Sequence, residues 1–415
     1  MRRSPSLLRT AAVPSVLTLV VALTPASAAP APTVTIQPTD RADSSYVCAW
    51  PMIVNADTLN VYLPETDATY WKMDYYLETG RKLVIRGIYP FARFFEFTTY
   101  DGDGNPIDNG SIVDKQIKPE RGSRNPFRTR KASDNLSERR YRVVIKPHAD
   151  PSNNAVSGLP GGVTAGDASL IYRLYVPDDP RHLKGDVGLP KITDVDASGV
   201  KTRLLPCKRT QSPAASGASI VAAPAGTEAA SPCPPGIVFN LHSAASLYPN
   251  PANKYVLAEA CFHSGLVVVV TGNGPTFPDT RAGQSVTGAS DMRYWSICQN
   301  LNMGTYPVVD CKADYEIPLT PGRGYTVVIS GNEDRPSNAT TAHGVAWLPW
   351  GDHSQMAIIV LRNMLPDGAF CCSVQKAIAL GQPVDVVMGP YYPHAKYCTT
   401  AGFESDGAAC AAQTP

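Results

Sequence analysis

The 415-residue sequence has little charge, since Asp, Glu, Lys and Arg make up 18% of it. Three arginines lie in the first 28 positions, where there is no acidic residue, so residues 29–415 carry 34 basic and 36 acidic side chains, a formal charge of −2. A chain so nearly balanced lacks the positive surplus typical of nucleic-acid-binding proteins, and we expect no nucleic-acid partner.

The well-defined motifs of catalysis and metal binding are missing. The sequence contains no G-x-S-x-G, no phosphate-binding loop, no G-x-G-x-x-G, no H-E-x-x-H and no C-x-x-C. We therefore expect no cofactor and no metal. Because a catalytic triad can be assembled from residues far apart in the sequence, a hydrolase stays open as an alternative.

No apolar run reaches the roughly 20 residues that a membrane-spanning helix needs. The apolar stretch from Val13 to Leu23 follows three arginines and precedes Ala26-Ser27-Ala28, a pattern that predicts a cleaved signal peptide over residues 1–28. The pair Arg2-Arg3 leaves the twin-arginine route open beside general secretion. We expect a secreted protein without a membrane span in its mature chain.

Ten cysteines, an even number, all follow residue 28 and predict a disulfide-bonded exported chain. Cys207 and Cys233 bracket a segment of linker composition and are plausible partners. Cys298 and Cys311 are expected to join two neighbouring strands. The adjacent Cys371-Cys372 is expected to bond two different partners rather than to close on itself.

Residues 206–236 are rich in Ala, Ser and Pro and have almost no charge, which predicts a linker. They divide the mature chain into residues 29–205 and 237–415. Both parts contain short β-branched or aromatic runs bounded by Gly, Pro, Asn and Asp, and helical periodicity is scarce outside 371–380. The pattern predicts an all-β protein with few short helices, built as two tandem antiparallel β-sandwich or jelly-roll units.

The two parts share an ordered series of features. A tyrosine precedes, at the same spacing in both parts, a glycine that ends a β-branched run, and a proline follows at the third position. An aromatic strand, a Tyr-x-Val-Val-Ile strand, a Leu-Pro pair and an arginine at equal spacing after that pair complete the series. The matches are Tyr70 and Tyr255, Gly87 and Gly272, Pro90 and Pro275, 94–101 and 292–299, 141–145 and 325–329, Leu159-Pro160 and Leu348-Pro349, and Arg173 and Arg362. The series predicts an internal duplication; the alternative is that any two β-rich segments share Gly-Pro turns and valine runs.

Three of these features together resemble a known family. An aromatic strand ending in Tyr100-Asp101, the later Trp347-Leu348-Pro349 and a closing R-x-Y-x-P strand at 173–177 are similar, in patches, to an uncharacterised β-sandwich domain family of bacterial secreted and envelope proteins. The first part has Gly158-Leu159-Pro160 where the family has Trp, and the second lacks the closing tyrosine at 362–366. The resemblance implies a fold and a compartment, and no activity.

Residues 342–356 concentrate the side chains that could form a ligand site. Trp347 and Trp350 would offer a flat platform for a sugar or another ring, with Asp352, His353 and the nearby His343 as polar partners. The alternative is that the tryptophans pack in the sandwich core and that Asp352 and His353 are ordinary loop residues.

The matched Arg173 and Arg362 each lie within an otherwise apolar strand. A buried arginine is costly unless it is paired, so each is expected to meet a carboxylate, backbone carbonyls or a ligand; we favour a structural pair with Asp, and the alternative is an anionic ligand between the two units. Arg86 has no counterpart, because Thr271 takes its place. Oxygen-bearing residues two apart at 101–108 are typical of a calcium loop, but Asp, Gly, Asn and Pro are also what a tight turn requires, and we favour the turn.

These patterns favour a secreted, non-enzymatic binding or structural protein of the cell envelope or external medium, whose partner is an unidentified small molecule or envelope polymer. The alternative is a secreted hydrolase acting on an envelope polymer or ester, with its site near His343–His353 or between the units. A hydrolase requires at least two of Asp352, His353, His343 and Arg362 to converge within hydrogen-bond reach.

Overall fold

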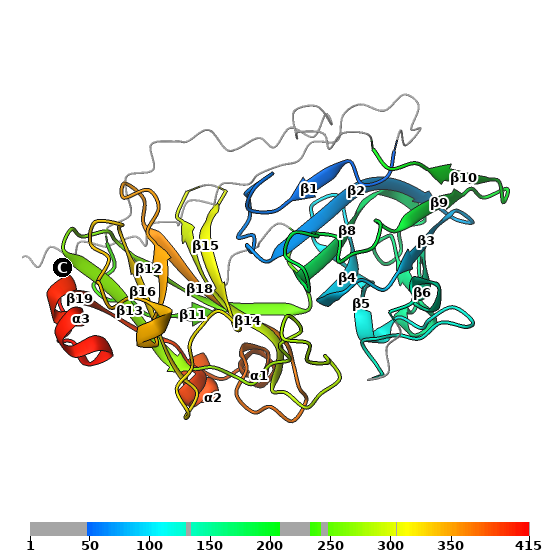
Figure 1. Cartoon of the computed structure of the whole chain (residues 1–415). Coiled ribbons are helices and arrows are strands. Elements are labelled where there is room, and N and C mark those ends of the chain that lie inside the picture. Colours follow the sequence, from blue (N-terminus) through cyan, green and yellow to red (C-terminus); the bar gives the residue numbers. More distant parts are fainter. Residues whose placement is uncertain (1–47, 130–133, 208–232, 242–247, 304, 415) are drawn as a thin grey trace, which may run out of the picture. The chain divides into compact units, whose positions relative to one another are not determined.

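The computed structural model describes residues 48–129, 134–207, 233–241, 248–303 and 305–414 (Figure 1). The predicted signal peptide and most of the predicted linker lie outside these ranges. All the described residues belong to one compact unit. We call residues 48–207 the first half and residues 233–414 the second half; the unit boundaries proposed from the sequence stay a prediction.

The first half contains two five-stranded sheets. The first sheet has the order β1 (Met52–Val54), β2 (Ala68–Glu78), β8 (Ala165–Pro177), β4 (Ala92–Tyr100), β5 (Pro106–Val113). The second has the order β10 (Lys201–Leu204), β9 (Lys191–Val195), β3 (Lys82–Ile88), β6 (Arg140–Lys146), β7 (Ala155–Ser157). All neighbours are antiparallel except β6 and β7, which are parallel. Apolar side chains of both sheets form one core.

The second half also has two sheets and its own core. The first sheet has the order β11 (Asn240–Leu241), β12 (Asn253–Ala260), β18 (Ala357–Pro366), β14 (Met292–Leu301), β15 (Val308–Ala313). The second has the order β17 (Ala346–Pro349), β16 (Gly324–Ser330), β13 (Leu266–Asn273), β19 (His394–Thr399). The second half also contains three short helices, α1 (Val374–Leu380), α2 (Val384–Met388) and α3 (Thr400–Asp406).

The strand orders of the two halves correspond. The order β1-β2-β8-β4-β5 matches β11-β12-β18-β14-β15, and β3-β6-β7 matches β13-β16-β17. Even the parallel pairing recurs, since β17 runs parallel to β16 as β7 does to β6. The predicted all-β fold class is confirmed, and this order is the one that the predicted duplication requires. A common origin of the halves stays an inference.

A glycine facing a tyrosine explains one of the matches. Gly87 lies opposite Tyr141 on the neighbouring strand, and Gly272 lies opposite Tyr325. A Cβ on Gly87 would overlap the Tyr141 hydroxyl, and a Cβ on Gly272 would lie 2.7 Å from the Tyr325 hydroxyl oxygen. The aromatic ring therefore lies over the glycine in both halves, and glycine recurs for this steric reason.

Two of the sequence matches are out of register. Glu96 on β4 lies opposite Arg173, and Ser296 on β14 lies opposite Arg362, so Glu96 and Ser296 correspond. The sequence match of 94–101 with 292–299 is shifted by two residues relative to this structural alignment. The reason is that a match by residue type ignores which residues face each other across the sheet.

The sequence match of Leu159-Pro160 with Leu348-Pro349 is shifted by three residues relative to the structural alignment, for the same reason. Val144 pairs with Ala155 on β7, and the corresponding Val328 pairs with Trp347 on β17. Leu348 therefore corresponds to Val156, and Leu159-Pro160 lies beyond the end of β7.

All ten cysteines form disulfides: Cys48–Cys207, Cys233–Cys261, Cys298–Cys311, Cys371–Cys372 and Cys398–Cys410. The prediction for Cys298 and Cys311 is confirmed, since they face each other on β14 and β15. The pairing of Cys207 with Cys233 is wrong, because the amide of Cys207 donates to the carbonyl of Ala49 (3.1 Å) and so lies beside Cys48. The prediction for Cys371 and Cys372 is also wrong: they bond each other, because every other cysteine is already paired.

Replacing Gly87 with Ala should lower the free energy of unfolding by about 1–3 kcal/mol, because the added Cβ collides with the Tyr141 ring in a packed core. Gly102→Ala is the control: nothing lies within 4 Å of its Cβ position, so stability should change by less than about 0.5 kcal/mol. Urea unfolding measures both variants. If the two variants were equally stable, the Tyr141 ring would not be the reason for glycine at position 87.

Candidate functional site

The two halves meet through a shared cluster of buried apolar side chains. The first half contributes Ala68, Phe94, Val113, Tyr175 and Val176, and the second contributes Ala252, Tyr294, Ala313 and Met364. Corresponding positions recur on both sides, for example Phe94 with Tyr294 and Val113 with Ala313. A patch that contacts its own counterpart is the arrangement of a two-fold interface.

Two ion pairs cross this interface reciprocally. Arg93 on β4 pairs with Asp314 of the second half, and Arg293 on β14 pairs with Asp114 of the first half at 2.8 Å. Asp114 and Asp314 each follow directly on the last strand of the first sheet in their half. Burial raises the pKa of Asp314 to about 7 and also raises the pKa of Asp114, and the facing arginine opposes the shift in each case.

Sequence reasoning missed these four residues, although a signal was present. The separation of Arg93 from Asp114 along the chain equals that of Arg293 from Asp314. The repeat comparison relied on glycines, prolines and apolar runs, so it passed over a matched pair of opposite charges.

Arg173 and Arg362 occupy equivalent positions, as predicted, and both are buried. Arg173 donates to Glu96 (2.9 Å) and to the carbonyl of Tyr248 in the second half (2.8 Å). Its guanidinium thus takes a carboxylate from its own half and a backbone carbonyl from the other.

Arg362 shows the same arrangement with one exchange. Ser296 stands where the first half has Glu96, and the carboxylate comes instead from Glu65 of the first half, which pairs with Arg362 and accepts from the Ser296 hydroxyl (2.7 Å). The carbonyl of Leu63 completes the contacts (3.0 Å). Carboxylates and carbonyls of the protein therefore surround both arginines; an added anionic ligand at them stays a prediction.

Glu65 also lies beside a disulfide. One oxygen of its carboxylate and the sulfurs of Cys298 and Cys311 lie within 4.8 Å of one another. Because the two sulfurs are bonded to each other, neither is the thiolate that a metal ion requires.

The two tryptophans of 342–356 have different environments. Trp350 is 2% exposed and lies in the core, where its indole N–H donates to the carbonyl of Gln355 (3.2 Å). Trp347 is half-buried on β17, donates to Ser330 (3.1 Å) and lies 4.1 Å below the Arg335 guanidinium. The structure places Trp350 as the core alternative describes.

The polar side chains of residues 342–356 form local contacts, either within their own turn or with a neighbouring side chain. The Asp352 carboxylate accepts from the hydroxyl and amide of Ser354, and these bonds lower its pKa. His353 stacks on Phe262 with 3.8 Å between ring centroids, and its Nδ1 lies 3.5 Å from Glu333.

His343 bonds Thr340 at the end of the 341–343 turn (2.8 Å). Among the described residues, no hydrogen bond or ion pair joins any two of Asp352, His353, His343 and Arg362. The convergence that the hydrolase alternative requires is therefore not present in the described part of the chain.

Asp101 accepts from the amides of Asp103 (3.0 Å) and Asn105 (2.8 Å), and its second oxygen lies 3.3 Å from the Asn105 side-chain amide. The carboxylate is thus committed to closing the β4–β5 turn, which accounts for the residue types at 101–108.

One sheet face of the first half is strongly basic. The inward residues of β3, β6, β7, β9 and β10 belong to the core, so the alternate residues point outward. We call these outward residues the basic sheet face. Its cations are Lys82, Arg86, Arg140, Arg142, Lys146, Lys191, Lys201 and Arg203. These five strands are described throughout, and none of their outward residues is Asp or Glu.

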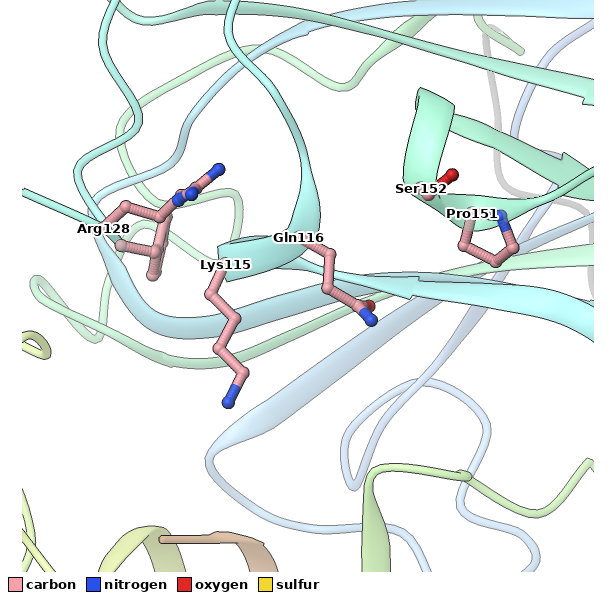
Figure 2. Close-up of a pocket in the computed structure, with 6 residues that line it drawn as sticks. Lys115, Gln116, Arg128, Pro151 and Ser152 are labelled. Atoms are coloured by element: carbon pink, nitrogen blue, oxygen red, sulfur yellow. The ribbon is translucent and has the colours of Figure 1, made fainter. Parts of the chain in front are cut away.

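A pocket of about 440 Å³ lies between the turn that follows β5 and the turn that precedes β7. Figure 2 shows Lys115, Gln116 and Arg128 on one side and Pro151 and Ser152 on the other. Asn154, which follows the 151–153 turn, donates to the carbonyl of Arg142 on β6 (3.1 Å). The pocket therefore lies near the β7 edge of the second sheet, and Lys115 and Arg128 are its cations.

Comparison with known protein families finds no matching family model, and comparison with curated proteins finds no match. Among solved structures, the chain is similar to an uncharacterised protein from Burkholderia cenocepacia, with a TM-score of 0.51 and 14% identity over 85% of this chain and 82% of that one. A protein from Vibrio parahaemolyticus matches with a TM-score of 0.40 and 11% identity over 80% of this chain and 89% of that one.

At these identities the likeness to the Burkholderia protein concerns the fold alone. The chain thus shares its fold with an uncharacterised bacterial protein. No helix among the described residues is long and apolar enough to cross a membrane.

Replacing Asp314 with Ala should lower the free energy of unfolding by about 3–5 kcal/mol at pH 8, where its carboxylate is ionised, because Arg93 would stay buried without its close partner. Asp179→Ala removes an ion pair with Arg181, whose side chain is 82% exposed, and should leave stability close to that of wild type. Urea unfolding compares them. If Asp314→Ala lowered the unfolding free energy no more than Asp179→Ala, the buried pair would not stabilise the contact between the halves.

Replacing Trp350 with Ala should cost about 3–5 kcal/mol of unfolding free energy, because a large buried side chain is removed from the core. Trp347→Ala removes a half-buried ring and should cost about 1 kcal/mol. Thermal and urea unfolding distinguish the two. A Trp350→Ala protein of unchanged stability that had lost ligand binding would instead support the predicted platform.

Proposed function

We propose that the protein is a secreted, non-enzymatic binding protein of the cell envelope or external medium, built from two units of the uncharacterised β-sandwich family that its sequence resembles. Its ten cysteines, all paired, fit an oxidising compartment.

The observation that carries the proposal is how the buried charges are used. Arg93, Arg293, Arg173 and Arg362 all pair with carboxylates, and three of the four pairs join one half to the other. Because these buried charges are used to join the two halves, we assign them a structural role rather than a catalytic one. The first half also carries a cluster of cations on the basic sheet face, most of them exposed among the described residues.

Binding and hydrolysis can be separated in one experiment. The mature protein is mixed with insoluble bacterial envelope material at physiological salt, the mixture is centrifuged, and both fractions are analysed. We expect the protein to sediment with the envelope while mass spectrometry finds no released fragment. Protein that stays in the supernatant, or soluble fragments that accumulate with time, would contradict the proposal, and the fragments would favour the hydrolase alternative.

A further inference from the structure

We propose that the basic sheet face binds an acidic polysaccharide, a polymer that carries carboxylate groups at regular intervals. The inference rests on the proposed function, since it names the ligand class of an envelope-binding protein. Its evidence is the placement of the cations, the corresponding face of the second half, and the residue types that the face omits.

Three cations stand in one row across three strands. Arg86 on β3 lies directly opposite Lys191 on β9 and opposite Arg142 on β6. Neighbouring strands are about 4.8 Å apart, and like charges directly opposite each other destabilise a sheet. The row therefore costs stability unless an anion lies over it.

Acidic side chains do not neutralise this row. Arg86 lies 3.5 Å from Glu120, and their side chains are 58% and 32% exposed, so water screens the pair and it contributes little. Among the described residues, Arg142 and Lys191 have no ion-pair partner. Positive charge is therefore left available to a ligand.

The second half shows that the fold itself does not require cations here. Thr271 and Thr326 face each other where the first half has Arg86 and Arg142. Around them, outward valines of β13 and β16 pack under the C-terminal segment, in a small cluster with Phe403 and the Cys398–Cys410 disulfide. One copy of the sheet is thus covered by its own C-terminal segment, whereas among the described residues no such segment covers the basic copy.

The extent of the face favours a polymer over a single small anion. Lys82 and Arg86 point outward from the same strand four residues apart, about 13 Å at 3.3 Å per residue. Arginines bind planar carboxylates through two parallel hydrogen bonds, which suits the uronic-acid groups of an acidic polysaccharide.

The face also omits the features that other polyanions require. Its outward strand residues include no aromatic side chain, whereas single-stranded nucleic acid is bound by stacking its bases on aromatic rings. Val84 and Val144 lie between the basic residues but are only 5% and 9% exposed, so neither of these apolar side chains can insert into a membrane surface.

The test measures binding of labelled polygalacturonate to the mature protein and to the double variant Arg86→Gln/Arg142→Gln. We expect a dissociation constant at least tenfold higher for this variant, and wild-type affinity that falls as salt rises. The control Lys184→Gln/Lys376→Gln removes the same charge from exposed positions off the face and should stay within twofold of wild type. The melting temperature of Arg86→Gln/Arg142→Gln should be unchanged or higher, because the repulsion is relieved.

Equal weakening in both double variants would overturn the site, since net charge alone would then explain binding. Tighter binding of single-stranded DNA or of phosphatidylglycerol vesicles than of polygalacturonate at the same salt would overturn the ligand class. If wild type and Arg86→Gln/Arg142→Gln sediment equally with envelope material, this inference fails and the proposed function stands. If wild type does not sediment, the proposed function itself fails.

Discussion

The contact between the halves depends on two buried ion pairs, Arg93–Asp314 and Arg293–Asp114. Moving a charge from water into a protein interior costs several kcal/mol, and losing one partner of a buried pair leaves that cost unopposed. Each pair takes one charge from each half. A contact rotated or shifted by one residue would therefore leave charges buried without partners, or place arginine against arginine. The pairs thus select one arrangement out of the many that apolar contact between Phe94, Tyr294 and their neighbours would allow.

This interface also bears on the predicted internal duplication. A surface that contacts its own counterpart is what a symmetric dimer of identical chains uses, and a duplicated chain can form the same contact within itself. The reciprocal bonds to backbone carbonyls, from Arg173 to Tyr248 and from Arg362 to Leu63, follow the same rule. Around Arg362 the symmetry is broken by one exchange. Arg173 pairs with Glu96 of its own half, but the residue that corresponds to Glu96 in the second half is Ser296. Arg362 therefore pairs with Glu65 of the first half instead.

The sequence was informative wherever one residue type follows from local sterics or from a cross-strand neighbour. The all-β class, the glycines under Tyr141 and Tyr325, the equivalence of Arg173 and Arg362 and the Cys298–Cys311 bond were predictable in this way. Strand register, the partners of Cys207 and Cys233, and the interface charges depend on which segments meet in three dimensions, and spacing along the chain does not encode that. The tryptophan site stays a prediction: Trp350 and Trp347 are three residues apart, yet one lies in the core and the other on the opposite face of the sheet, a difference that spacing along the chain does not reveal.

The outer faces of the two second sheets differ most clearly between the halves. In the second half, Val267, Val269 and Val328 are buried by a C-terminal segment that a disulfide fixes in place, so that face contributes to stability. In the first half, no such segment follows β10 among the described residues, and the same face carries Arg86, Arg142 and their basic neighbours. Solubility alone does not explain why these residues are all basic, because a mixture of acidic and basic side chains would also make the face soluble. Such a mixture would not place like charges opposite each other on neighbouring strands. A row of cations kept against their mutual repulsion is better explained by an anion that binds there.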